Sequence, residues 1–172
     1  LEEMPEVDAV VGIGSNEKIC DVIQSALAGK KVQRYGAKED LPLCGGRVIS
    51  TLPYYAYLKI AEGCDKRCSY CIIPYLRGPY RSVPMEQLLA EARELAENGV
   101  RELILVAQET TLYGKDLYGE KTLPKLLHEL AQIPGIYWIR IQYCYPEEIT
   151  DELIQAIKTE EKVCRKHRQF LK

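Results

Sequence analysis

Residues 103–107 read Leu103-Ile104-Leu105-Val106-Ala107, an apolar run in which no polar residue alternates. Strands that are covered on both faces have this pattern in parallel sheets. The Asn98-Gly99 pair just before it is typical of a helix end, so a helix is expected to lead into the run. The run therefore predicts a buried strand of a parallel sheet.

Further strand and helix patterns lie on both sides of this run. Before it, residues 55–61 alternate like a strand, and residues 85–96 place apolar side chains on one helical face. After it come a helical pattern at residues 123–131, a third strand at residues 138–143 and a third helix that Thr150 is placed to cap. Three consecutive strand–helix units predict an α/β fold with right-handed connections and a parallel sheet, either a barrel or an open sheet.

Three units do not close a barrel, because a complete eight-unit barrel takes about 250 residues. Residues 163–172 begin like a fourth strand and then turn into a basic tail where an apolar run is due. We therefore expect a chain that is truncated at both ends. We assign no function to the atypical tail, residues 165–172.

The region before the three units has a different organisation. Residues 1–35 look like the end of a smaller α/β domain, with a buried strand at residues 8–14 and a helix that Asn16 can cap. Residues 36–53 are rich in glycine and proline and have no sustained period, which predicts a linker or covering loop. We expect the main domain to occupy residues 54–164.

The composition excludes several classes of protein. The chain has 172 residues, of which 47% are hydrophobic, and a formal net charge of -2, which excludes a disordered or collagen-like chain. No stretch approaches the roughly 18 apolar residues that a membrane span needs, and the start lacks the profile of a secretory signal. We therefore expect a cytoplasmic protein with no membrane partner. The charge gives no general attraction to nucleic acid.

Three cysteines dominate the functional interpretation, in the segment Cys64-Asp65-Lys66-Arg67-Cys68-Ser69-Tyr70-Cys71. The chain has seven cysteines, an odd number, which suits a reducing compartment and a metal site better than a disulfide framework. Three thiolates can bind three corners of one iron–sulfur cluster and leave the fourth iron open to an exchangeable ligand. This spacing therefore predicts substrate binding at iron.

Three alternatives stay open. A zinc site usually needs two pairs of ligands, and the two histidines, His128 and His167, show no ligand spacing. The three thiols could instead be reduced and purely structural. A cluster used only for electron transfer would need a fourth ligand, which Cys44 or Cys144 would have to supply through space.

The cysteine segment resembles the radical S-adenosylmethionine (SAM) superfamily, in which an aromatic residue, here Tyr70, precedes the third cysteine. The resemblance implies that Cys64, Cys68 and Cys71 hold a 4Fe–4S cluster whose open iron binds the amino and carboxylate groups of SAM. Tyr70 would lie near the adenine. Reduction would then cleave SAM to methionine and a 5′-deoxyadenosyl radical. The superfamily's core is a partial (βα)6 barrel of TIM type, and the three units would form its first half.

Gln108 and Glu109 end the central strand at the rim where SAM's amino group is usually met in this superfamily. The resemblance therefore implies that both bind the cofactor. The alternative is a solvated loop start, which is common for a polar pair at a strand end. We name no catalytic residue.

The flanks of the cysteines, residues 57–64 and 72–82, are similar to the methylthiotransferase family. Three segments resemble the branch that modifies an aspartate of ribosomal small-subunit protein twelve: Arg77-Gly78-Pro79-Tyr80-Arg81-Ser82, Ala107-Gln108-Glu109-Thr110-Thr111 and Tyr143-Cys144-Tyr145-Pro146. The tRNA-modifying branch usually reads differently at all three. One departure is Val83, which stands where the family usually has arginine.

The resemblance also implies partners. These are a ribosomal small-subunit protein as substrate and a reductant protein of flavodoxin or ferredoxin type. A second 4Fe–4S cluster is expected only in a full-length chain, because Cys20 and Cys44 do not match its ligands. Nucleic acid would bind only through a C-terminal domain that is missing here. We expect this chain to hold at most the SAM-cleaving cluster and not to complete methylthiolation. A tRNA methylthiotransferase and a non-catalytic iron–sulfur or zinc module remain the alternatives.

Overall fold

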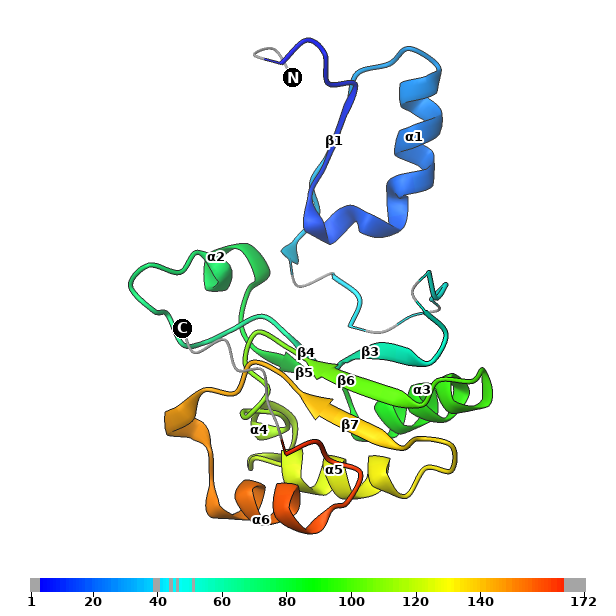
Figure 1. Ribbon diagram of the computed structural model, residues 1–172. Coiled ribbons are helices and arrows are strands. Elements are labelled where there is room, and N and C mark those ends of the chain that lie inside the picture. The colour runs from blue at the N-terminus through cyan, green and yellow to red at the C-terminus, as the bar shows by residue number, and fades with distance from the viewer. Residues whose placement is uncertain (1–3, 39–40, 44, 46, 51, 166–172) are drawn as a thin grey trace.

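The structure is a computed structural model and is shown in Figure 1. It describes residues 4–38, 41–43, 45, 47–50 and 52–165. None of the helices in these ranges is long and apolar enough to cross a membrane.

A three-stranded parallel sheet forms the centre of the main unit. Its strands are β3 (Tyr55–Lys59), β6 (Glu102–Val106) and β7 (Trp138–Ile141), with β6 in the middle. The prediction of a buried strand at residues 103–107 is confirmed, because the middle of β6 is buried. Strand and helix residues share one hydrophobic core, which includes Leu58, Leu88, Leu103, Leu105, Leu126, Leu130 and Ile139.

Three helices lie together on one side of this sheet (Figure 1). α3 (Met85–Glu97) contacts β3 and α5 (Leu123–Ala131), α5 also contacts β7, and α6 (Asp151–Thr159) packs against α5. The Thr150 hydroxyl accepts a hydrogen bond from the backbone N–H of Leu153 at 3.3 Å, so the predicted cap of α6 is confirmed. Helices on one face of a parallel sheet are the arrangement of a partial barrel.

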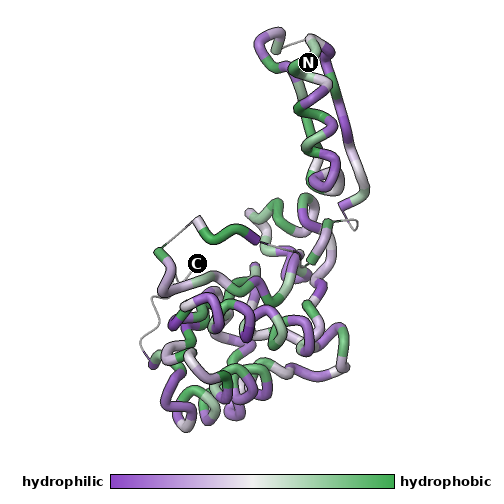
Figure 2. Tube along the Cα trace, turned by 90° about the vertical axis from the view of Figure 1, so that its right-hand side faces the viewer, coloured by the Kyte–Doolittle hydropathy of each residue, from purple (hydrophilic) through white to green (hydrophobic). Residues whose placement is uncertain are grey.

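A smaller unit precedes the main sheet and projects away from it in Figures 1 and 2. It contains β1 (Ala9–Val11), the 3₁₀ helix η1 (Ile13–Lys18), α1 (Ile19–Leu27) and β2 (Val32–Arg34), which pairs in parallel with β1. Two predictions were wrong here. Asn16 lies inside η1 and does not cap α1, because the chain is already helical before Ile19. β1 is only half-buried, since a two-stranded sheet with one helix leaves much of its surface open.

Two regions at the borders of the main unit also pack against it. Leu43 and Ile49, from the predicted linker, lie against the main core. Val163 forms a parallel bridge with Ile139, as the start of a fourth strand would. Of the predicted basic tail, only Arg165 falls within the described residues.

Several short elements were not predicted. They are β4 (Ala61–Glu62), α2 (Ile73–Arg77), β5 (Arg81–Ser82), α4 (Lys115–Tyr118) and the 3₁₀ helix η3 (Pro146–Glu148). The expected strand at residues 55–61 is divided into β3 and β4, because β4 leaves the parallel sheet and pairs antiparallel with β5. This pairing brings together the two ends of the loop at residues 63–80, which contains the cysteine segment.

Gly63 allows the chain to turn from β4 into the cysteine segment. Its φ of +77° lies in the left-handed region, which favours glycine. A Cβ atom at this position would lie 2.0 Å from the carbonyl oxygen of Pro79. The next residue, Cys64, donates its backbone N–H to the Gly78 carbonyl at 3.2 Å. The close approach of these two backbones therefore fixes where the first cysteine lies.

We expect Gly63→Ala to lower the free energy of unfolding by about 3 kcal/mol, because a backbone clash adds to the left-handed strain. Gly119→Ala is the matched control. Gly119 has the same φ of +77°, and among the described residues beyond its chain neighbours no atom lies within 4 Å of the Cβ that alanine would add. The control should cost only about 1 kcal/mol. Urea denaturation of both variants measures the difference, and equal losses would contradict the role of the close approach.

Candidate functional site

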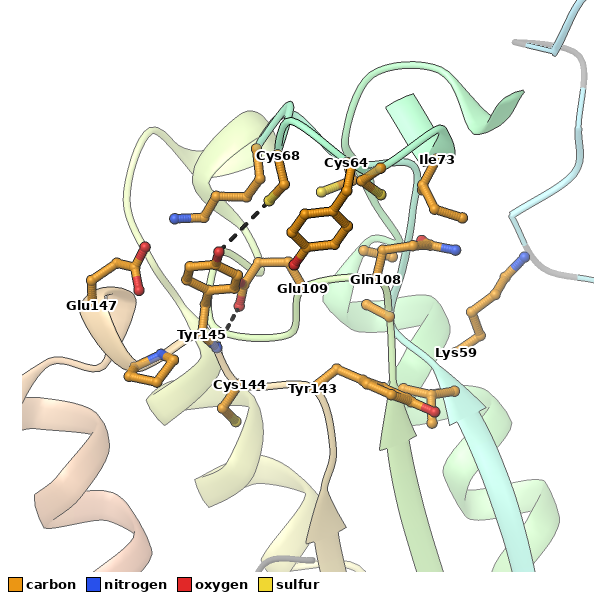
Figure 3. A pocket seen from close by; sticks show the side chains of 17 residues that line it. Lys59, Cys64, Cys68, Ile73, Gln108, Glu109, Tyr143, Cys144, Tyr145 and Glu147 are labelled. Atoms are coloured by element: carbon orange, nitrogen blue, oxygen red, sulfur yellow. Dashed lines mark hydrogen bonds between the residues drawn. The ribbon is translucent and has the colours of Figure 1, made fainter. Parts of the chain in front are cut away.

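A cavity of about 580 Å³ opens at the edge of the sheet where the parallel strands end (Figure 3). Three segments supply its walls: the cysteine segment after β4, the residues that follow β6, and the residues that follow β7. Ligands collect at this edge in parallel α/β proteins because all the strands end there. The volume lies within the usual range for small-molecule sites.

All three predicted ligand cysteines line this cavity. Cys64 is buried, whereas Cys68 and Cys71 are half-buried, and all three are free thiols. A hydrogen bond of 2.9 Å from the Cys71 backbone N–H to the Cys68 carbonyl closes the turn between them. The structure therefore places the three predicted ligands together at the mouth of the cavity.

Among the residues that the structure describes, no three His, Cys, Asp or Glu side chains form a group that could hold a metal ion. A zinc ion needs its sulfur ligands about 2.3 Å from a single centre, whereas a cubic cluster takes each thiolate at a different iron. Within the described part of the chain, the cavity is lined by the three predicted cysteines and by no histidine, and thiolates are the usual ligands of an iron–sulfur cluster.

Burial raises the pKa of the Cys64 thiol, and a hydrogen bond from the backbone of Lys66 partly opposes this effect. The thiol must lose its proton before it can bind a metal, so binding at this position would release a proton.

Glu109 is 1% exposed, so it is not the start of a solvated loop. Its Oε1 atom accepts hydrogen bonds from the backbone N–H of Thr111 at 3.0 Å and of Tyr145 at 3.3 Å, and also from the Thr111 hydroxyl. Its Oε2 atom is buried and has no hydrogen-bond partner within the described residues. Such an atom is costly to bury unless a ligand satisfies it.

Gln108 presents a second buried acceptor. Its Nε2 atom donates to Glu62 Oε1 at 3.3 Å, while its Oε1 atom is buried without a partner in the described part of the chain. Gln108 and Glu109 both line the cavity. Two unsatisfied acceptors side by side in sequence fit a ligand that carries several N–H donors, such as an ammonium group.

Glu62 was not predicted as part of the site. Its carboxylate is 2% exposed and accepts hydrogen bonds from Lys59 Nζ at 3.1 Å, Arg77 Nη1 at 3.5 Å and the backbone N–H of Gly63 at 3.1 Å. A buried carboxylate needs such partners to stay charged. Glu62 therefore joins the base of the cysteine segment to Gln108 and α2. In the sequence, only its position directly before Gly63-Cys64 indicated that Glu62 belongs to the site.

Glu148, in η3, forms a second charged cluster. It pairs with Lys66 from the cysteine segment and, at 2.7 Å, with Lys121. Hydrogen bonds from Lys121 and Lys66 lower the pKa of Glu148 to about 2. Glu148 therefore stays ionised and holds the cysteine segment against η3.

Tyr145 contacts the same cluster. The Lys66 ammonium lies 4.5 Å from the centre of the Tyr145 ring, and the Tyr145 hydroxyl lies 3.6 Å from Cys68 Sγ (Figure 3). The contact with Cys68 raises the pKa of Tyr145 to about 12. The hydroxyl is therefore a proton donor at neutral pH.

Other residues that the sequence singled out occupy different positions. Tyr70 lines the cavity but is 71% exposed. Cys144 lies 3.4 Å from the Thr110 hydroxyl, and Figure 3 shows it on the far side of the cavity from Cys64 and Cys68. It is therefore not placed as a fourth ligand, and Cys44 lies outside the described residues. Val83 is fully buried in the core and does not line the cavity.

Comparison with curated proteins finds relatives that are named methylthiotransferases. It is 58% identical over 165 residues to the "Ribosomal protein uS12 methylthiotransferase RimO" of Lachnoclostridium phytofermentans, covering 95% of this chain and 38% of that protein. It is 52% identical over 166 residues to the protein of the same name from Caldanaerobacter subterraneus, covering 96% of this chain and 38% of that protein. The chain therefore spans little more than a third of the length of these relatives.

Comparison with solved structures supports the fold. The radical S-adenosylmethionine methyltransferase TsrM from Kitasatospora setae, with tryptophan substrate and a SAM analogue bound, matches with a TM-score of 0.59 at 13% identity. The match covers 89% of this chain and 35% of that one. At this identity the likeness concerns the fold alone, and the predicted fold class is confirmed.

The sequence pattern of the radical SAM superfamily matches residues 58–164. The match begins in β3, includes the three cysteines at the cavity mouth and continues through all three strand–helix units. On this match, which covers most of the chain, the protein belongs to the radical SAM superfamily.

Proposed function

We propose that this chain is the cluster-binding and SAM-binding part of a methylthiotransferase that modifies an aspartate of ribosomal protein uS12. One observation carries the proposal: three cysteines and two unsatisfied acceptors, Gln108 Oε1 and Glu109 Oε2, line the same cavity. The names of relatives that are 58% and 52% identical to the chain support the choice of substrate. They favour uS12 over tRNA.

Cys64, Cys68 and Cys71 would hold a 4Fe–4S cluster by three of its irons, so that the fourth iron faces the cavity. When bound, the reduced cluster and SAM together would supply the radical that removes a hydrogen atom from the substrate. The protein itself supplies binding and orientation. Its thiolates hold the cluster, and the buried wall of the cavity limits the access of water.

Gln108 and Glu109 would orient SAM. The two unsatisfied oxygens would accept hydrogen bonds from the N–H groups of its amino group, which binds the open iron as a neutral amine. Tyr70, at the exposed side of the cavity, would lie near the adenine. In this arrangement the polar end of SAM lies between the cluster and the oxygens of Gln108 and Glu109, and the adenine lies beside Tyr70.

The remaining expectations belong to the whole protein. We propose a second 4Fe–4S cluster outside this chain, a reductant of flavodoxin or ferredoxin type and a cytoplasmic location. Within the chain, we propose that residues 1–35 belong to a neighbouring domain, residues 36–53 to a linker and residues 54–164 to the SAM-binding core. The similarity of the motifs to the methylthiotransferase family supports these assignments.

Removing any one of Cys64, Cys68 and Cys71 should abolish cluster binding, because each supplies one of only three protein anchors. After anaerobic reconstitution with iron and sulfide, the unmodified chain should hold about four iron atoms, and each Cys→Ala variant should lose most of them. Cys144→Ala is the matched control, since Cys144 lines the same cavity. Full iron content in any of the three variants would refute the assignment of that cysteine.

Glu109→Gln should weaken SAM binding to the reconstituted chain by about tenfold, because a hydrogen bond to a charged group is replaced by a weaker one. Glu147→Gln is the control, since Glu147 also lines the cavity. A SAM analogue without the amino group should bind the unmodified chain and Glu109→Gln equally well in equilibrium dialysis. An unchanged dissociation constant for SAM would contradict the role of Glu109.

The substrate can be tested in a hybrid protein. The matching segment of the Lachnoclostridium phytofermentans relative would be replaced by this chain, which is 58% identical to it. The hybrid should add a methylthio group to uS12 and not to tRNA, as mass spectrometry of both would measure. Modification of tRNA, or of neither, would overturn the proposed substrate, and the same hybrid with Cys68→Ala serves as the inactive control.

A further inference from the structure

The Tyr145 hydroxyl contacts one of the three predicted cluster ligands, Cys68. It lies 3.6 Å from Cys68 Sγ, although the two residues are 77 positions apart in the sequence. A sulfur–oxygen distance of this size suits a hydrogen bond. A cysteine that binds iron is a thiolate and has no proton to give, so the tyrosine would be the donor.

Two contacts hold Tyr145 in this position. Its backbone N–H donates to Glu109 Oε1 at 3.3 Å, and its ring lies 4.5 Å from the Lys66 ammonium. Lys66 is held in turn by Glu148, which also pairs with Lys121 at 2.7 Å. The hydroxyl therefore comes from a residue that is fixed at its backbone and at its ring.

We propose that Tyr145 is a positioning residue that donates a hydrogen bond to the Cys68 thiolate and thereby raises the reduction potential of the cluster. This inference rests on the proposed function, because it requires the cluster at Cys64, Cys68 and Cys71. Hydrogen bonds to the sulfur ligands are among the protein's means of setting cluster potentials.

The direction of the effect follows from charge. In the one-electron reduction an external reductant gives one electron to the cluster, and no bond in the protein forms or breaks. The reduced form carries one more negative charge, part of it on the sulfur ligands. A donated hydrogen bond stabilises the more negative form more strongly, so it favours reduction. The effect matters here because the cluster must pass an electron to SAM.

Tyr145 is the donor that mutation can remove cleanly. Cys64 receives its hydrogen bond from the backbone of Lys66, which no side-chain substitution deletes. Tyr145→Phe removes only the hydroxyl and keeps the ring under the Lys66 ammonium. The charges of Lys66 and Glu148 near the cluster therefore stay the same, and a change in potential reports the hydrogen bond alone.

The test is a redox titration of the reconstituted chain with dithionite, without SAM, in which electron paramagnetic resonance follows the reduced cluster. We expect Tyr145→Phe to reduce the equilibrium constant for reduction by about tenfold, a potential more negative by about 59 mV for one electron. Iron and sulfide content should be unchanged. Tyr143→Phe is the matched control, since Tyr143 lines the same cavity.

Each outcome of the titration supports or overturns the role of Tyr145. A lower potential in Tyr145→Phe, with an unchanged one in Tyr143→Phe, supports the inference. An unchanged potential in Tyr145→Phe, or an equal fall in both variants, overturns it and leaves the proposed function intact. If the unmodified chain takes up no cluster, the inference and the proposed function both fail.

Discussion

The site depends on the parallel pairing of β3, β6 and β7. In this sheet Lys59 pairs with Val106, and Leu105 with Ile141, so the three strands end at the same edge. The segments that follow them are far apart in sequence, but the pairing brings them to one cavity. The buried core of the sheet and its helices forms the rigid part of the protein, and the loops that carry chemistry extend from it.

Charge pairing then fixes the cysteine segment on this edge. Glu62 binds Lys59 and Arg77 at the base of the segment, and Glu148 binds Lys66 further along it. Each carboxylate joins parts of the chain that the sheet alone does not connect. The basic side chains near the cysteines are therefore largely engaged by acids of the protein, and attraction of an anionic cluster does not depend on an open basic patch.

Much of the fold could be predicted from the sequence because its main helices are periodic and its central strand is an unbroken apolar run. The apolar run at residues 103–107 indicated the central strand, and Thr150 indicated a helix start. β4 and β5 have only two residues each, too few to show a period. Asn16 was predicted to cap α1 because asparagine is a favoured residue at helix starts. In the structure the backbone before Ile19 is already helical, so α1 does not begin at Asn16.

The candidate site was predictable to a similar extent. The spacing of Cys64, Cys68 and Cys71 is local and was visible in the sequence, as was the polar pair that follows β6. The roles of Glu62 and Glu148 were not, because their partners are chosen by the tertiary structure. Lys66 and Glu148, for example, are 82 positions apart. Nor could the sequence reveal which oxygens of Gln108 and Glu109 lack partners, since that depends on side-chain orientation.

In the proposed site, three cysteines leave one iron open beside the oxygens of Gln108 and Glu109. The most direct measurement is electron paramagnetic resonance of the reduced, reconstituted chain before and after addition of SAM labelled with nitrogen-15 in its amino group. We expect the spectrum to change on addition and to show a coupling between the cluster and the labelled nitrogen. An unchanged spectrum without coupling, at a SAM concentration that saturates binding, would contradict the claim.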